Sequence, residues 1–126
     1  MELVFILQTL VLFLTALIHV YIFVLESFLW MKPATRKAFK TSEAEAQTTS
    51  GLAYNQGFYN LFLALGLFYG IWLGQPGYLL VNYIMCFVFA AGLVLFVSRP
   101  AMRKSALYQL IPPVIYFVLK AVGNRL

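Results

Sequence analysis

The stretch from Leu3 to Trp30 constrains the fold of this chain more than any other, because it is long and almost entirely apolar. At about 1.5 Å of rise per residue, a helix of this length crosses a hydrocarbon layer about 30 Å thick. Its only acidic or basic side chains are His19 and Glu26. Such groups are costly inside a membrane, so they must face protein or a wet cavity. The stretch therefore predicts a membrane-spanning helix that carries two polar residues with a specific role.

The strongly polar residues of this stretch fall on one face of the expected helix. His19 and Glu26 are seven residues apart, which at about 100° per residue places them within about 20° of each other. Gln8 and Thr15 project within about 40° of the same line. We expect this stripe to face protein or water, while the rest of the helix faces lipid.

Composition extends the same conclusion to the whole chain. Of the 126 residues, 63% are hydrophobic and only 10% are charged, against about 25% charged in an ordinary soluble domain. Four apolar spans follow one another, at about residues 3–30, 52–73, 78–97 and 106–122. The predicted fold is an all-α membrane protein, one domain over residues 1–126, with four transmembrane helices in an antiparallel bundle. Pro112-Pro113 removes two backbone donors, so the fourth helix is expected to be kinked or broken there.

The basic residues indicate how the chain lies in the membrane. Loops 31–51 and 98–105 share one side and hold seven Lys and Arg residues, whereas the other side holds only Lys120 and Arg125. Under the positive-inside rule both loops are cytoplasmic and both termini lie outside, in a plasma (inner) membrane. This bias accounts for the net charge of +5, so nucleic acid is not an expected partner and membrane lipid is.

Depth in the membrane indicates which polar residues meet. Glu26 lies about 6 Å inside the cytoplasmic end of the first span, and His19 lies about 10 Å deeper. The second and fourth spans start from the same side, which places five amide and phenol side chains in the layer of Glu26: Asn55, Gln56, Tyr59, Asn60 and Gln109. We interpret this layer as a pocket in the cytoplasmic half that binds a small amphipathic molecule. His19 and Glu26 are its candidate catalytic residues, for acid–base chemistry as a pair.

Other interpretations stay open at this point. Glu26 can bond to Asn55 or Gln56 simply to hold helices together, as polar side chains often do in membranes. His19 has no second His and no Cys cluster nearby, so no metal site is expected, and no cofactor follows from the residues. A proton-coupled small-molecule exporter is an alternative, since small four-helix multidrug exporters also carry a glutamate in their first span, although Glu26 lies off-centre here. A structural or partner-binding subunit without its own chemistry is the third alternative.

Two segments resemble a known family. Ile18–Ile22 (IHVYI), with Leu25–Phe28 (LESF) and Trp30, resembles the first-helix signature of small membrane proteins called domain of unknown function 1304. Asn55–Asn60 (NQGFYN), followed by Leu63-Ala64, is similar to the second-helix motif of that family. The resemblance covers essentially the whole chain and implies four spans, but it brings no established activity.

The layout also resembles, more distantly, the membrane-associated proteins of eicosanoid and glutathione metabolism. Arg36–Phe39 is similar to the basic stretch after their first helix, and Gln56-x-x-Tyr59-Asn60 is similar to their Asn-x-x-Glu-Asn. Tyr59 stands where that motif has its acidic residue, and the arginine expected just before it is missing. The resemblance therefore does not imply glutathione binding, but it does imply a homo-oligomer, trimeric as in that family.

Overall fold

The computed structural model describes residues 1–123, and this part of the chain is mostly helical, with no strand. Its elements are, in order, α1 (Glu2–Ser27), α2 (Pro33–Phe39), α3 (Glu43–Leu73), the 3₁₀ turn η1 (Gln75–Gly77), α4 (Tyr78–Ser98), the 3₁₀ turn η2 (Pro100–Met102) and α5 (Arg103–Gly123). The segments containing α1, α3, α4 and α5 are long and apolar enough to cross a membrane. The predicted all-α architecture with four spans is confirmed.

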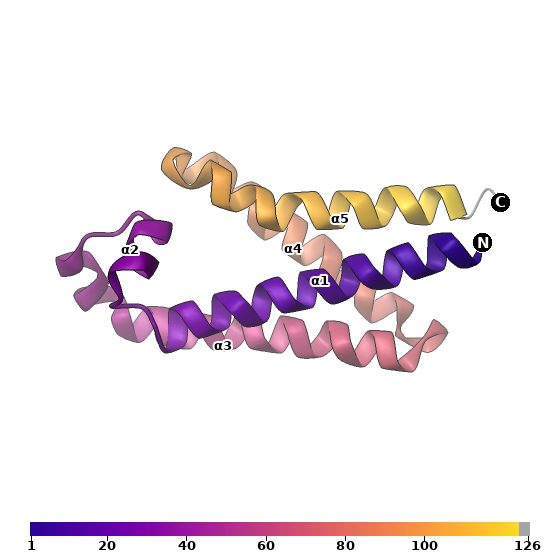
Figure 1. Ribbon diagram of the computed structural model, residues 1–126, viewed down its shortest axis with the longest axis horizontal. Helices are drawn as coiled ribbons and strands as arrows, with labels where there is room; N and C mark the ends of the chain where they lie inside the picture. Colours follow the sequence, from indigo (N-terminus) through magenta and orange to yellow (C-terminus); the bar gives the residue numbers. More distant parts are fainter. Residues whose placement is uncertain (124–126) are drawn as a thin grey trace.

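The four long helices form two pairs, α1 with α3 and α4 with α5, and α1 also contacts α5. α1 begins and α5 ends at the same end of the bundle, while α2 lies at the opposite end (Figure 1). We call this opposite end, made of residues 28–42 and 99–104, the basic end. It carries seven of the nine Lys and Arg residues: Lys32, Arg36, Lys37, Lys40, Arg99, Arg103 and Lys104.

The helices differ from the predicted spans mainly at the basic end. α1 stops at Ser27 rather than Trp30, and α3 starts at Glu43, well before the apolar sequence begins. This early start has a local cause, because Ser42 and Glu45 form a capping box. The Glu45 backbone N–H donates to Ser42 Oγ (3.2 Å), and the Ser42 N–H donates to Glu45 Oε2 (2.8 Å). A polar sequence thus becomes helix because its first backbone donors are satisfied.

The hydrophobic core lies in the half of the bundle away from the basic end. It is built from Leu12 and Ala16 of α1, Ala64 and Leu67 of α3, Val81, Ile84, Met85 and Val88 of α4, and Tyr116 of α5. Pro112 and Pro113 are both buried, and α5 continues through them without a break. All four long helices therefore contribute to one core.

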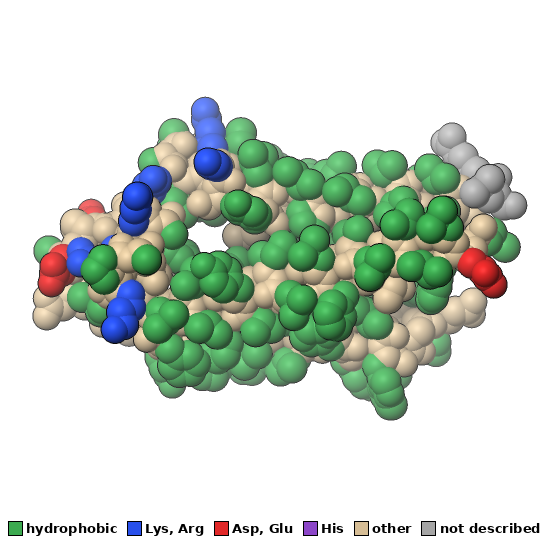
Figure 2. All heavy atoms as spheres, in the orientation of Figure 1, with side chains coloured by type: hydrophobic (Ala, Val, Ile, Leu, Met, Phe, Trp, Pro, Cys, Tyr) green, Lys and Arg blue, Asp and Glu red, His purple; other side chains and the backbone are tan. Residues whose placement is uncertain are grey.

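Toward the basic end the two helix pairs separate. The space-filling view shows an opening through the molecule between α1 and the first part of α5, with Lys and Arg side chains above it and to its left (Figure 2). Among the described residues of this half, the side-chain hydrogen bonds that link helices lie within each pair. Glu26 of α1 is hydrogen-bonded to side chains of α3. Gly92 of α4 lies against Gln109 and Leu110 of α5.

Candidate functional site

The polar stripe of α1 faces the inside of the protein. Thr15 and His19 are each 1% exposed and Glu26 is 5% exposed, while Gln8 is half-buried. The helical period alone placed these residues on one line, and packing against the other helices buries that line. The expectation that the stripe faces protein is therefore met.

His19 is held by its own helix. Its Nδ1 lies 2.8 Å from the Thr15 carbonyl oxygen, so Nδ1–H donates and Nε2 is the nitrogen left to accept in the neutral ring. Thr15 is held in the same way, with its hydroxyl donating to the Val11 carbonyl (2.7 Å). Within residues 1–123, His19 forms no hydrogen bond to another helix and none to Glu26.

Glu26, in contrast, joins two helices. The Asn60 amide of α3 donates to Glu26 Oε2 at 2.9 Å, and the Gln56 amide approaches Oε1 at 3.5 Å. Asn60 also donates to the Gln56 carbonyl at 3.2 Å, which fixes its own position one turn along α3. Glu26, Gln56 and Asn60 thus form an amide–carboxyl cluster between α1 and α3.

A close approach of the two backbones brings this cluster together. Gly57 of α3 lies against Phe23 and Ser27 of α1, where a Cβ would overlap Ser27 Oγ and lie 3.0 Å from the Phe23 carbonyl oxygen. The Ser27 hydroxyl donates to the Tyr54 carbonyl at 2.9 Å and ties the same helices together. The absence of a side chain at Gly57 therefore sets the distance across which Glu26 reaches its amide partners.

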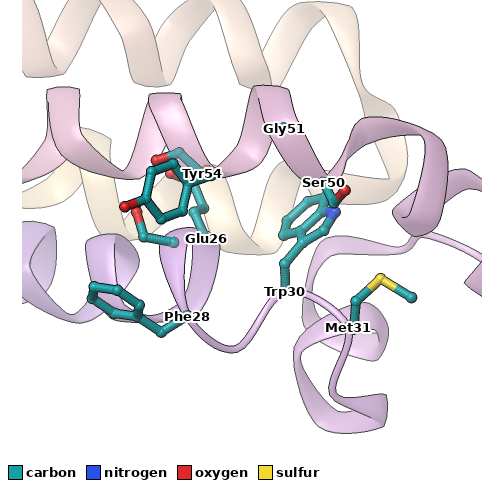
Figure 3. A pocket seen from close by; sticks show the side chains of 8 residues that line it. Glu26, Phe28, Trp30, Met31, Ser50, Gly51 and Tyr54 are labelled. Carbon is teal, nitrogen blue, oxygen red and sulfur yellow. The ribbon is translucent and has the colours of Figure 1, made fainter.

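A hollow of about 340 Å³ lies beside Glu26 at the basic end. Its lining comes from the end of α1, the following loop and the start of α3: Glu26, Ser27, Phe28, Trp30, Met31, Ser50, Gly51 and Tyr54. Tyr54 and Glu26 lie toward one end of this hollow and Trp30 and Met31 toward the other (Figure 3). We call it the Glu26 hollow.

Trp30 forms a fixed wall of the Glu26 hollow. Its indole N–H donates to the Ala46 carbonyl (3.1 Å) and approaches the Thr49 hydroxyl oxygen (3.3 Å). Its ring also packs edge-on against Phe39 of α2, with 5.0 Å between centroids. A larger hollow of about 480 Å³ lies at the start of α1, but it is lined only by residues from 1–6. That hollow is lined by one helix end alone, whereas the Glu26 hollow joins two helices and a loop, so we place the candidate site at Glu26.

The structure brings some of the predicted site residues together and leaves others apart. Glu26 meets Gln56 and Asn60, as the shared depth predicted. Asn55 and Tyr59 are exposed on α3 and form no side-chain hydrogen bond within the described part of the chain. Gln109 packs beside Gly92 of α4 and is not bonded to Glu26. The functional roles of these residues, and of His19 and Glu26 as a catalytic pair, stay predictions.

Sequence reasoning missed most of the lining of the hollow. Phe28, Trp30 and Met31 belonged to the expected end of a span and its loop, and nothing in the pattern showed that this segment folds back over α3. It also missed the buried hydrogen bond from the Tyr116 hydroxyl of α5 to Asn82 Oδ1 of α4 (2.9 Å). Depth in the membrane could have predicted that pair, since both residues lie a few positions inside the end opposite the basic loops.

No group of three or more metal-ligating side chains occurs among residues 1–123.

Four membrane-length apolar helices packed in two pairs define an integral membrane protein of the four-helix bundle class. Residues 13–120 match the family described as Protein of unknown function (DUF1304), so the chain belongs to that family. The resemblance of its first two helices is thereby confirmed. Comparisons with curated proteins and with solved structures gave no match.

Proposed function

We propose that this protein binds a small amphipathic molecule in the Glu26 hollow. The apolar part of the ligand lies against Phe28, Trp30 and Tyr54, and its polar group reaches the Glu26 carboxyl group. The observation that carries the proposal is a buried carboxyl group, with Glu26 5% exposed, on the lining of a hollow that also contains three aromatic side chains. Polar groups buried at this depth in a membrane protein often mark a functional site.

The two hydrogen bonds of Glu26 are unequal, and this favours binding over a purely structural role. Asn60 holds one oxygen at 2.9 Å, whereas Gln56 is exposed and its amide is 3.5 Å from the other oxygen. A carboxyl group has more acceptor sites than these two contacts use. A hydroxyl or ammonium group of a ligand can therefore replace Gln56 while Asn60 keeps Glu26 oriented.

The size and walls of the hollow support a ligand with a short tail. About 340 Å³ is at the small end of the range for small-molecule pockets, about 300–1,000 Å³. If both basic loops face the cytoplasm, as the positive-inside rule indicates, the hollow opens at the cytoplasmic leaflet of the plasma membrane. We propose binding rather than conversion, because His19 lies two helical turns, about 10 Å, from Glu26.

Trp30 provides a direct test, since the only other tryptophan is Trp72. In a Trp72→Phe background, Trp30 fluorescence of the purified protein in nanodiscs is titrated with hexylamine, hexanol and hexanoate, which share one tail. We expect saturable changes with hexylamine and hexanol, and weaker binding of hexanoate because Glu26 offers acceptors.

The same titration is repeated with Glu26→Gln, and with Tyr59→Phe as a matched change on an exposed residue of α3. We expect Glu26→Gln to lower the affinity for hexylamine about 10- to 100-fold, which is the effect of losing a hydrogen bond to a charged group. We expect Tyr59→Phe to leave this affinity unchanged. An unchanged hexylamine affinity in a folded Glu26→Gln protein refutes the proposal. Loss of thermal stability in Glu26→Gln without any ligand response supports the structural alternative instead.

A further inference from the structure

The opening between the two helix pairs has basic residues on both of its sides. In Figure 2 the Lys and Arg side chains of the basic end lie above the opening and to its left, while hydrophobic and backbone atoms border it. On the side of the α1–α3 pair they come from α2 and its flanking residues: Lys32, Arg36, Lys37 and Lys40. On the side of the α4–α5 pair they come from the residue before η2 and from the first turn of α5: Arg99, Arg103 and Lys104. Two segments far apart in the sequence thus present the same charge.

One arginine in each segment is held in place through its Nε–H. Arg36 Nε donates to the Met31 carbonyl at 3.2 Å, and Arg103 Nε donates to the Phe96 carbonyl at 3.1 Å. The Arg103 guanidinium also lies over the Phe96 ring, 5.0 Å from its centroid. Holding Nε leaves the terminal amino groups of Arg103 as donors in a fixed position, which lowers the entropy lost when an anion binds, whereas one terminal amino group of Arg36 already faces Glu43.

Acidic partners account for only part of this charge. Glu43 lies 3.6 Å from Arg36, and Glu45 interacts electrostatically with Arg99. Among residues 1–123, Arg103 has no carboxylate within 4.0 Å, and the same holds for the four lysines of the basic end. This end of the bundle therefore carries an excess of positive charge where the apolar helices leave the membrane.

We propose that an anionic phospholipid docks at this opening. One acyl chain enters between the α1–α3 and α4–α5 pairs, and the phosphate group lies between the basic residues of the two sides. Hydrophobic side chains border the opening in Figure 2, which suits an acyl chain, and basic pockets between membrane helices are known to take anionic headgroups. A second copy of this chain fits less well, because it would bring an equally positive basic end. This site lies between the helix pairs, so the inference goes beyond the Glu26 hollow and does not rest on it.

Native mass spectrometry of the purified protein, stripped of lipid in detergent, tests the proposal. Phosphatidylglycerol and phosphatidylcholine with identical acyl chains are titrated separately. We expect one equivalent of phosphatidylglycerol to bind at least tenfold more tightly than phosphatidylcholine. Neutralising one basic residue should lower the affinity for phosphatidylglycerol about fivefold, because each charge near the membrane surface contributes about 1 kcal/mol. The triple change Arg99→Gln, Arg103→Gln and Lys104→Gln should therefore lower this affinity about 100-fold.

Lys120→Gln is the matched control for Lys104→Gln, because Lys120 lies at the other end of the same helix. It should leave phosphatidylglycerol affinity unchanged. If the triple variant does not fold, the exposed single changes Lys37→Gln and Lys104→Gln decide the outcome alone. Equal affinity for the two lipids, or full affinity in these variants, overturns the proposal. Inorganic phosphate that binds as tightly as the lipid overturns it as well.

Discussion

Gly57 offers the sharpest test of how α1 and α3 are held together. The change is Gly57→Ala, which adds one methyl group on the face of α3 that meets α1. That methyl would overlap Ser27 Oγ and lie 3.0 Å from the Phe23 carbonyl oxygen and 3.1 Å from the Ser27 backbone nitrogen. Ser27 can turn its hydroxyl away, but it then loses the bond to the Tyr54 carbonyl. The backbone atoms can only move apart, by a few tenths of an ångström.

Three contributions set how much Gly57→Ala changes the free energy of unfolding. Overpacking a tight contact costs about 1–3 kcal/mol, and the lost Ser27 hydrogen bond costs about 0.6–1.7 kcal/mol in a membrane protein. Replacing glycine by alanine within a helix returns about 1 kcal/mol. We therefore expect the free energy of unfolding to fall by about 0.6–3.7 kcal/mol. Because Glu26 precedes Ser27, the same movement should weaken ligand binding in the Glu26 hollow.

The assay is unfolding of the purified protein in mixed detergent and dodecyl sulfate micelles, followed by circular dichroism. Gly51→Ala is the matched control, since Gly51 lies in the same helix and a Cβ there meets nothing within 4 Å. It should be neutral or stabilising by up to about 1 kcal/mol. Adding Ser27→Ala to Gly57→Ala should recover part of the loss. Equal stability of the Gly57→Ala and Gly51→Ala proteins would refute the close-packing explanation.

Two further predictions concern hydrogen bonds inside the bundle. Asn60→Ala removes the shortest bond to Glu26 and should lower the free energy of unfolding by about 1–3 kcal/mol; Asn55→Ala, on an exposed neighbour, should change it by less than about 0.5 kcal/mol. Tyr116→Phe removes the bond to Asn82 and should cost about 0.6–1.7 kcal/mol. In a double-mutant cycle, Asn82→Ala should cost little more once Tyr116 is Phe, and fully additive losses would show that the two side chains do not interact.

The sequence by itself determined the class of the protein and the content of its first helix. Four apolar spans of membrane length leave little choice but helices, because every backbone polar group in a bilayer must be satisfied within its own segment. The stripe of Thr15, His19 and Glu26 was predictable for a similar reason, since the period of a helix is a local property. The capping box at Ser42 and Glu45 is just as local, and its motif was present in the sequence although the predicted span started later.

Only the tertiary structure decided which residues of one layer touch. Depth along a helix follows from counting residues, but rotation about the axis follows from which neighbour packs on which face. Asn55 and Asn60 were therefore equally good partners for Glu26 until the contact at Gly57 turned one of them inward and left the other exposed. Gln109 has the predicted depth as well, yet it packs with α4 because the helix pairs separate at the basic end. That separation, and the fold-back of residues 28–31 that lines the hollow, depend on contacts between distant segments, which no local pattern records.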